Sequence, residues 1–416
     1  MKYVLIGAGS RGMVYAEYAH EHGDEIVAIA EIRKERLANA ASILETPAAN
    51  CFTDTDDLFA LGKVADACII ATMDRDHYGH VMKALDVGYD ILLEKPISPD
   101  ARECIEIEQK ANALGLKITV CHVLRYTEFF MTLKEIIDSG ELGKIVAIKH
   151  SENIGNWHMA HSFVRGNWAN EADSSPIIMQ KSCHDMDILL WLTGSHCTRV
   201  SAFGSLTYFK EENAPAGSTA RCLDCPVAEN CRFDARKNYL PVIGDWPSDV
   251  VCIEQTEEAV LKALKTSPYG RCVYRCGNDV CDHMSTIMEF ENGVTATFSL
   301  TAQTTRIRRE INIFLEDGEI YGDDDAGIIT YTKFVSSEAD TIHTNQIRIY
   351  GVDGGHNGGD PALMKDFTDN ISGKATESRS SISRSVESHL MACAIEKARV
   401  TGEVVSLDKF REEIMK

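Results

Sequence analysis

Long apolar runs are missing from this 416-residue chain, and no stretch reaches the roughly 18 apolar residues of a transmembrane helix. A basic excess is missing too: 63 acidic and 42 basic side chains give a formal net charge of −21. Such a charge repels nucleic acids and anionic membranes, so we expect a small-molecule partner instead. The first apolar run, "YVLIG", is shorter than a signal-peptide core and leads straight into glycines, which predicts a cytoplasmic protein.

Cysteines are too sparse for a disulfide-rich secreted domain, with 14 in the whole chain. Several stand singly in apolar runs, such as Cys68 and Cys393, which indicates reduced, buried thiols. No internal repeat or low-complexity linker interrupts the sequence. The apolar content of 44% is ordinary for a globular protein, and the length favours two to three domains.

The first third of the chain alternates apolar runs with helical segments. The runs "YVLIG", "EIVAIAE", "ADACIIAT", "YDILLEK" and "KITVCHV" are nearly continuous in apolar residues, which is typical of strands buried on both faces. Helices are expected from Met13, from Lys34, over 77–87 and over 101–114. The pattern predicts an α/β domain with a Rossmann-type parallel sheet in residues 1–122.

The pattern changes after residue 122. A helix over 129–139 precedes the longer and more polar "KIVAIKHSE". The segments "IMEFENGVTATFSL" and "INIFLEDGEIYG" break at Asn-Gly and Asp-Gly, which are strong hairpin signals. Residues 123–416 are therefore expected to form a second α/β domain with a large, mainly antiparallel open sheet. Helices over 181–192, 361–371 and 385–399 are expected to pack on that sheet.

The segment "GAGSRG" fits the dinucleotide fingerprint, because it follows a strand and opens a helix. Its candidate cofactor-binding residues are Gly7, Ala8, Gly9, Ser10, Arg11 and Gly12. Glu31 ends the second strand, where a carboxylate can accept a hydrogen bond from a ribose 2′-hydroxyl, so NAD is favoured. Arg33 could instead pair with a 2′-phosphate, which keeps NADP as the weaker alternative.

A longer stretch, "IIATMDRDHYGHVMKALDVGYDILLEKPIS", resembles the Gfo/Idh/MocA oxidoreductase family. The resemblance continues through "HVLRY", "IIDSGELGKI" and "CHDMDILLWLTG" and returns in "GGDPALMKDF" and "AIEKARVTGEVVSL", so it covers nearly the whole chain. It implies a Rossmann domain joined to a sugar-binding α/β domain on an open antiparallel sheet. It also implies a homodimer or homotetramer.

The resemblance assigns roles to particular residues. Lys95 would contact both the substrate hydroxyl and the nicotinamide ribose, and His184 would be the acid/base that exchanges the hydroxyl proton. Arg125, in "HVLRY", would contact substrate. The remaining cofactor contacts would be Thr72, His77 and Glu94.

One departure from the family pattern concerns the position four residues before the catalytic histidine. Many members have an aspartate there, whereas this chain has Gln180, which cannot ionise. Lys181 could share a helical face with His184 and bring a second ammonium group beside Lys95. Two cations would lower the pKa of His184, or of one lysine, so either could be the base.

The polar loop "NIGNWHMAHSFVRGNWAN" precedes that helix and suits a carbohydrate site, because sugars bind aromatic faces and planar polar groups. The alternative is a structural loop with its tryptophans packed inward. The candidate substrate contacts in the loop are Trp157, His161, Arg165 and Trp168. Weaker candidates are Asn278, Asp279, His356 and Asp360.

The segment "RCLDCPVAENC" brings Cys222, Cys225 and Cys231 within ten residues. C-x₂-C is a chelating pair, so we expect a structural zinc site in an insertion over residues 211–281. Cys272 is the first choice for the fourth ligand and Cys276 the second, with Cys281 and Cys252 also within the insertion. An iron–sulfur cluster or no metal at all remain alternatives.

The sequence thus predicts an NAD(P)-dependent oxidoreductase acting on a secondary hydroxyl of a sugar, polyol or glycoside. Two alternatives remain open. Some members of the family cleave glycosides by transient oxidation at C3 and elimination, with NAD recycled, and Lys181 or His161 could supply the extra base. A non-catalytic nucleotide or sugar sensor is the other alternative, although the presence of both Lys95 and His184 argues against it.

Overall fold

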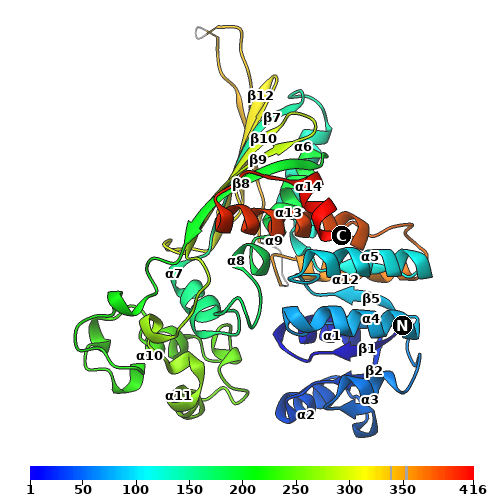
Figure 1. Ribbon diagram of the computed structural model, residues 1–416, viewed down its shortest axis with the longest axis vertical. Coiled ribbons are helices and arrows are strands. Elements are labelled where there is room, and N and C mark those ends of the chain that lie inside the picture. The colour runs from blue at the N-terminus through cyan, green and yellow to red at the C-terminus, as the bar shows by residue number, and fades with distance from the viewer. Residues whose placement is uncertain (338–339, 352–354) are drawn as a thin grey trace.

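The computed structural model describes residues 1–337, 340–351 and 355–416. Figure 1 shows a lower domain around a parallel sheet, a second sheet above it, and a separate lobe that contains helices α10 and α11. Among the described residues, no helix is long and apolar enough to cross a membrane.

The first sheet has six strands, all parallel, in the order β3-β2-β1-β4-β5-β6. Its strands are β1 (Lys2–Ile6), β2 (Glu25–Ala30), β3 (Cys51–Phe52), β4 (Ala67–Ile70), β5 (Asp90–Leu93) and β6 (Ile118–Val120). The helices between them are α1 (Ser10–Glu21), α2 (Lys34–Ile43), α3 (Thr55–Phe59), α4 (His77–Val87) and α5 (Ala101–Leu114). The predicted Rossmann-type parallel sheet is confirmed.

Local signals explain why α4 and α5 have the predicted bounds. The Asp100 carboxylate caps α5 by accepting a hydrogen bond from the Arg102 amide at 2.7 Å. Both helices end at a glycine in the left-handed region, Gly88 and Gly115. A short apolar strand follows each of these helices, β5 after α4 and β6 after α5. The strands contribute to two apolar clusters, so the parallel sheet is buried on both faces.

The second sheet has nine strands in the order β14-β13-β12-β11-β7-β10-β9-β8-β15. Its neighbours are antiparallel except β7 and β10, which run parallel. The strands are β7 (Ile145–Asn153), β8 (Cys197–Ser205), β9 (His283–Phe290), β10 (Thr295–Thr301), β11 (Arg308–Leu315), β12 (Gly318–Asp323), β13 (Ile328–Lys333), β14 (Thr344–Arg348) and β15 (Val405–Ser406). Both predicted hairpins, β9–β10 and β11–β12, are confirmed.

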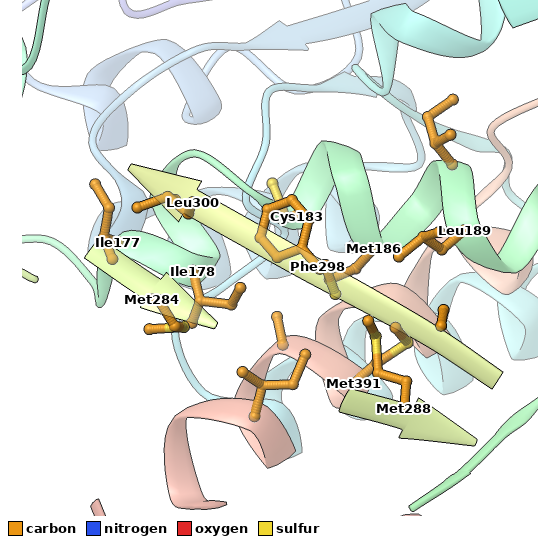
Figure 2. Close-up of a cluster of buried hydrophobic side chains, with 14 of the residues drawn as sticks. Ile177, Ile178, Cys183, Met186, Leu189, Met284, Met288, Phe298, Leu300 and Met391 are labelled. Atoms are coloured by element: carbon orange, nitrogen blue, oxygen red, sulfur yellow. The ribbon is translucent and has the colours of Figure 1, made fainter. Parts of the chain in front are cut away.

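Alternation along the strands buries one face of this sheet. Met284, Met288, Phe298 and Leu300 lie in one apolar cluster with Met186 of the α9 helix and Met391 of the α13 helix (Figure 2). The second region's helices are α6 (Glu128–Asp138), α7 (Asn156–His158), α8 (Ile177–Gln180), α9 (Cys183–Thr193), α10 (Ala235–Tyr239), α11 (Glu257–Thr266), α12 (Gly359–Ile371), α13 (Ile382–Thr401) and α14 (Leu407–Ile414). A turn with π-helical bonding over Met159–Arg165 follows α7.

The helices near the C-terminus bind the two domains together. Leu363 and Phe367 of α12 pack with Tyr3 and Tyr15 of the parallel-sheet domain. Helix α13 contributes Val386 to the core of that domain and other residues to the core of the second sheet. The prediction that all three late helices pack on the antiparallel sheet is therefore wrong for α12, because its apolar stripe matches the face that α1 leaves open.

The insertion over 211–281 is built differently from both sheets. All of it is described, and it contains short 3₁₀ turns, α10 and α11 but none of the named strands. A single bridge pairs Arg221 with Arg271 and holds its two cysteine-bearing segments side by side. Its own apolar core is small and includes Tyr239, Val260 and Leu264.

Candidate active site

The turn after β1 is shaped by two glycines. Gly7 has φ +90°, and a Cβ there would lie 2.5 Å from the Ala71 carbonyl oxygen. A Cβ on Gly12 would lie 2.0 Å from the Gly7 carbonyl oxygen. Helix α1 begins at Ser10 without a side-chain cap, so its first backbone N–H groups are available to an anion. The predicted phosphate loop therefore has the backbone shape that a pyrophosphate requires.

Glu31 lies beside this loop at the end of β2. Its carboxylate accepts hydrogen bonds from the Ala8 amide at 3.0 Å and the Arg33 amide at 2.9 Å. The Arg33 side chain is exposed. The acidic group is thus fixed next to the phosphate loop, where it can meet a ribose hydroxyl, whereas the nearby guanidinium is free to move.

Arg11 connects the phosphate loop to the second region. Its guanidinium donates to Glu94 at 2.8 Å and to both carboxylate oxygens of Asp360 at 2.6 and 3.0 Å. His356, at the start of the same turn, lies 3.0 Å from Asp360. Burial would raise the pKa of Asp360, but the hydrogen bonds from His356 and Arg11 outweigh it and lower that pKa. The Arg11 side chain therefore links domains, and two of the weaker candidates share its site.

The loop after β4 is held by a histidine. His77 is fully buried, with its ring nitrogens 2.6 Å from the Pro96 carbonyl oxygen and 3.2 Å from the Thr72 carbonyl oxygen. The Thr72 hydroxyl lies 3.1 Å from His80. His77 thus joins the Thr72 loop to the segment that follows Lys95, so its side chain fixes the position of the backbone on the predicted nicotinamide side.

Lys95 follows β5 at the carboxyl edge of the parallel sheet, where ligands bind in open α/β sheets. Its ammonium donates to the Gln180 carbonyl oxygen at 2.7 Å. The Gln180 side chain turns the other way and donates to the Ser174 hydroxyl at 2.6 Å. Gln180 therefore contacts Lys95 through its backbone carbonyl group, while its side-chain amide nitrogen is bonded to Ser174.

His184 lies in the first turn of α9 and is 7% exposed. Its Nδ1 atom has no hydrogen-bond partner among the described residues. Burial lowers the pKa of His184 well below its ordinary value, and Lys95, His122 and Arg309 lower it further. The imidazole is therefore neutral at physiological pH, which is the form that can accept a proton.

The Lys181 side chain forms an ion pair with a buried carboxylate. Its ammonium lies 3.1 Å from the buried Glu152 carboxylate, which also pairs with Arg309. Arg309 donates to Asp185 at 2.7 Å, and so a buried network lies beneath α9. The cations that lower the pKa of His184 are Lys95 and Arg309, and the expected second ammonium is neutralised by a carboxylate.

Arg125 is engaged in a buried ion pair. Its guanidinium donates to both oxygens of Asp187 at 2.6 and 2.8 Å and to the Arg379 carbonyl oxygen at 3.0 Å. It is 4% exposed, and its ring neighbour is Trp191. The structure thus places Arg125 beneath α9, in the wall behind His184.

The loop after β7 points largely toward the insertion. His161 lies 3.1 Å from the Tyr239 hydroxyl and stacks on Tyr269 at 5.0 Å. Arg165 is buried and donates to the Arg271 and Phe233 carbonyl oxygens at 2.8 and 2.6 Å. These two candidates therefore anchor the insertion.

The tryptophans of the same loop divide between two neighbours. Trp168 donates to Asp74 of the first domain at 3.2 Å, so it contributes to the contact between domains. Trp157 packs against Trp246 of the insertion, with ring centroids 5.2 Å apart. Trp246 is 40% exposed, so an aromatic surface remains accessible on this side of the loop.

His158, a weaker candidate of the same loop, lies near the charges of Lys181 and Lys95. Its ring packs edge-on to Trp246 at 5.0 Å. Burial lowers the pKa of His158 well below its ordinary value, and the nearby charges of Lys181 and Lys95 lower it further. The two other weak candidates are more distant from this chemistry: Asp279 accepts from the Glu171 amide at 2.8 Å, and the Asn278 amide nitrogen is buried without a partner.

The predicted cysteines meet at one small cavity of about 20 Å³ in the insertion. The cysteines among its lining residues are Cys222, Cys225, Cys231 and Cys272. Cys276 is not in that lining, and its thiol instead lies 3.2 Å from the Cys272 carbonyl oxygen. All fourteen thiols are free, and no three His, Cys, Asp or Glu side chains in the described ranges are arranged to hold a metal ion. A metal site is therefore not shown.

Several site residues had a signal that sequence reasoning missed. His150 and Glu152 occupy positions of β7 that share a face with the buried Ile148, so alternation alone marks them as buried charges. His122 follows the last parallel strand at the edge where Lys95 lies. Arg309, far away in the sequence, gave no local signal because its partners come from other elements.

Comparison with known proteins places the chain in a family. Residues 1–122 match the family model described as "Oxidoreductase family, NAD-binding Rossmann fold", and residues 134–407 match its "C-terminal alpha/beta domain". The oxidoreductase YteT of Bacillus subtilis (strain 168) is 26% identical over 75% of this chain and 74% of its own length. An inositol 2-dehydrogenase of Pseudarthrobacter chlorophenolicus is 29% identical over 52% of this chain and 60% of that protein.

Solved structures have the same fold. A levoglucosan dehydrogenase in complex with NADH and L-sorbose superposes with a TM-score of 0.73 at 16% identity, covering 98% of each chain. An NAD-binding oxidoreductase from Klebsiella pneumoniae gives a TM-score of 0.70 at 16% identity over 98% of each chain. The chain therefore belongs to the Gfo/Idh/MocA family of NAD-dependent oxidoreductases.

Proposed function

We propose that this enzyme oxidises or reduces a secondary hydroxyl or keto group of a sugar, polyol or glycoside. One observation carries the proposal: the Lys95 ammonium lies 2.7 Å from the Gln180 carbonyl oxygen, beside the helix that bears the neutral His184. A cation and a neutral imidazole thus meet at the same sheet edge as the phosphate loop. Relatives with inositol dehydrogenase names support a polyhydroxylated substrate.

The chemistry divides between cofactor and protein. NAD would be held at the Gly7–Gly12 loop beside Glu31, and it would supply the acceptor for the hydride on the carbon that bears the hydroxyl. Lys95 binds the hydroxyl oxygen and stabilises negative charge on it as the proton leaves. His184 takes that proton, which its low pKa permits because the imidazole is neutral beforehand. In the reverse direction the protonated imidazole returns the proton to the oxygen.

NAD is the proposed cofactor in preference to NADP. The Glu31 carboxylate is fixed at the phosphate loop by the amides of Ala8 and Arg33, and it would repel a 2′-phosphate. Titration of the full-length protein with each cofactor tests this assignment. NAD should bind more tightly than NADP, and replacing Glu31 with serine should reduce the difference between the two affinities. Tighter binding of NADP by the unmodified protein would contradict the assignment.

The reaction type is tested by the products. Incubation with a panel of sugars, polyols and NAD should release NADH and a keto product. Aryl glycosides without added NAD should yield no free aglycone. Aglycone release without net NADH would instead identify the glycosidase that works by transient oxidation. If the protein binds NAD but forms no product with either panel, the enzyme proposal is wrong and a sensor remains.

The glycosidase alternative has one supporting observation. That reaction needs a second base for a C2 proton, and His158 is a neutral imidazole whose pKa is lowered by burial and then by Lys181. His161, the histidine first considered for this role, is instead paired with Tyr239. If aryl glycosides are cleaved, replacing His158 with glutamine should slow aglycone release more than a single oxidation of the sugar.

We also propose that the insertion holds a structural zinc ion at the cavity lined by four cysteines. Those cysteines come from two segments held side by side by the Arg221–Arg271 bridge. Four thiolates are a common structural zinc ligand set, and the small apolar core of the insertion leaves it in need of a cross-link. In the described residues the thiols are not drawn together as a ready site, so binding would require them to close on the ion.

Metal analysis of the purified protein tests the zinc proposal. We expect one zinc per chain, lost in Cys225→Ser and retained in the control Cys51→Ser, because Cys51 lies alone at β3. Iron and visible absorption instead of zinc would support the iron–sulfur alternative. A metal-free protein with intact fold would contradict both.

Two further proposals concern organisation. The two domains are residues 1–122 and residues 123–416.

The open face of the second sheet mediates a homodimer or homotetramer. Phe203 and Ile287 on that face are 73% and 62% exposed, which supports a surface that binds a second copy of the chain. Light scattering after gel filtration tests the assembly, and a monomer would contradict it. The cytoplasmic location stays a prediction.

A further inference from the structure

His122 has the environment of a functional group that the mechanism above leaves unused. It is fully buried between β6 and the turn that bears Arg125. Both of its ring nitrogens lack a hydrogen-bond partner within the described residues. A buried polar group without a hydrogen-bond partner destabilises the fold, so an imidazole kept in this state needs an explanation.

The neighbours of His122 form a line that leads to the proposed base. On one side, its Nδ1 atom lies 3.9 Å from the Asp187 carboxylate. Its ring meets that of His184 edge-to-face, with centroids 5.8 Å apart and planes at 81°. The ring of His389 also lies close, with its centroid 5.4 Å from that of His122. Both nitrogens of His389 already have partners, which are the Ile97 amide and the Ser385 carbonyl oxygen.

His184 needs what His122 can supply. To accept a substrate proton on Nε2, a neutral imidazole must carry its own proton on Nδ1. That Nδ1 atom is buried and unpartnered. The family aspartate is replaced by Gln180, whose amide donates to Ser174 and the Ser175 carbonyl oxygen. His122 is the neighbouring imidazole with unpaired nitrogens.

We propose that His122 is the positioning residue of His184: it accepts the hydrogen bond from His184 Nδ1 and donates its own N–H to Asp187. This inference rests on the proposed function, since it assigns the group that fixes the tautomer of the proposed base. The edge-to-face contact, with ring centroids 5.8 Å apart, is the geometry from which the N–H···N bond would form. The Arg125–Asp187 pair then becomes the fixed end of the line, which gives Arg125 a role without substrate contact.

The charges around His122 keep it in the accepting form. Burial lowers the pKa of His122 to about 4, against an opposing effect of Asp187, and Arg125 and Lys95 lower it further. The groups that face it are Asp187 and His184 from α9, Glu94 and Lys95 from the end of β5, Arg125 from its own turn and His389 from α13. At neutral pH it therefore has one nitrogen free to accept. No net proton transfer beyond His184 is required.

The test compares His122→Phe and His122→Gln in the full-length enzyme with NAD and its oxidisable substrate. Phenylalanine keeps the ring but cannot accept, so kcat should fall about 10- to 100-fold, as for other lost outer partners. The acid limb of the pH profile should also move to lower pH, because protonated His184 loses its acceptor. Glutamine offers an amide oxygen and should restore most of kcat and the position of the limb.

His150→Phe is the matched control. His150 is also a buried histidine beneath α9, but its partner is Asp185 at 2.8 Å and its ring neighbours are Phe130 and Phe298. It should lower thermal stability without moving the acid limb. Equal acid limbs for His122→Phe and the native enzyme would overturn the inference. If His122→Phe does not fold, a folded His122→Gln whose kcat falls as far as expected for the phenylalanine variant would overturn it too.

The outcome also separates this inference from the proposed function. If the native enzyme forms no keto product with NAD, the proposed function fails; if His184→Ala retains full activity, the role of His184 as the base fails, whatever His122 does. If His184→Ala is inactive while His122→Phe keeps native kcat and pH profile, only the positioning role fails.

Discussion

Two buried arginines show how differently the catalytic region and the insertion are built. Arg309, beneath α9, is paired with the carboxylates of Glu152 and Asp185. Arg165, which faces the insertion, donates to two carbonyl oxygens and to the Cys222 sulfur at 3.2 Å. No ion pair with a carboxylate is found for Arg165 in the described parts of the chain, and its Nη1 atom has no partner.

The two arginines differ in their counter-charges: Arg309 has two carboxylate partners, whereas Arg165 has none within the described residues. Burial lowers the pKa of both guanidiniums, but Asp185 and Glu152 raise that of Arg309, whereas Tyr239 and the Cys222 thiol raise that of Arg165. The catalytic region thus supplies carboxylates as counter-charges to its buried guanidinium. Arg165, which lies outside the insertion and faces it, has the Cys222 sulfur beside it in place of a carboxylate, and a metal bound at Cys222 would add thiolate charge there.

The largest expected effect is a loss of catalytic activity when Lys95 is replaced. Lys95→Met should reduce kcat/KM about 10²- to 10⁴-fold, because the ammonium that stabilises the alkoxide is lost. Steady-state NADH formation measures this. Lys110→Met, which removes a surface lysine paired with Asp86, is the control and should behave as the native enzyme. A loss under threefold for Lys95→Met would remove this residue from the mechanism.

The next effect concerns stability beneath α9. Arg309→Met should cost about 3–5 kcal/mol of unfolding free energy, because it strands two buried carboxylates. Urea unfolding followed by circular dichroism measures the cost. Arg199→Met breaks an exposed pair with Glu289 and should cause no measurable change. If the two variants are equally stable, the network beneath α9 does not have the importance assigned to it here.

A smaller loss is expected for the arginine that faces the insertion. Arg165→Met should lower the free energy of unfolding by about 1–3 kcal/mol. The change leaves two carbonyl oxygens and a thiol without a partner, but it leaves no carboxylate unpaired. The same unfolding assay measures it. A cost as large as that of Arg309→Met would mean that Arg165 has a full counter-charge, and the contrast between the two regions would disappear.

The smallest effect is a pH dependence in the loop that anchors the insertion. Burial, and then Arg165, lower the pKa of His161 to about 3. The unfolded chain binds this proton below about pH 6.5 and the folded chain does not, so stability falls as pH drops through that window. His161→Gln should reduce the slope of the unfolding free energy against pH by up to about 1.4 kcal/mol per pH unit between pH 6 and 4.

Unfolding in urea at several pH values measures that slope. The exposed His22 provides the control variant His22→Gln, which should keep the native slope. An unchanged slope in His161→Gln would show that the ring is protonated in the folded protein, and the insertion would then not be sealed as described.

The fold was largely predictable because its signals are local. Apolar runs, the glycines of the phosphate loop and the Asn-Gly turn are each read within a few residues, and they identify both sheets. The packing of α12 on the first domain was not predictable, because a helix stripe does not reveal which sheet it will meet.

The site was predictable only in part, for a physical reason. Lys95 and His184 were found through their motifs, and the structure brings their neighbourhoods together. Whether a polar side chain faces a ligand or another buried group depends on partners far away in sequence. Arg125 with Asp187, Arg165 with Cys222 and Lys181 with Glu152 are such cases.

The central claim is that neutral His184 accepts the substrate proton as hydride leaves the same carbon. Chemical rescue tests it most directly: NADH formation by His184→Ala is measured with the oxidisable substrate, with and without added imidazole. The account predicts a fall of at least about 100-fold, with a rate that rises with the concentration of free imidazole. Native activity in His184→Ala without imidazole would contradict it.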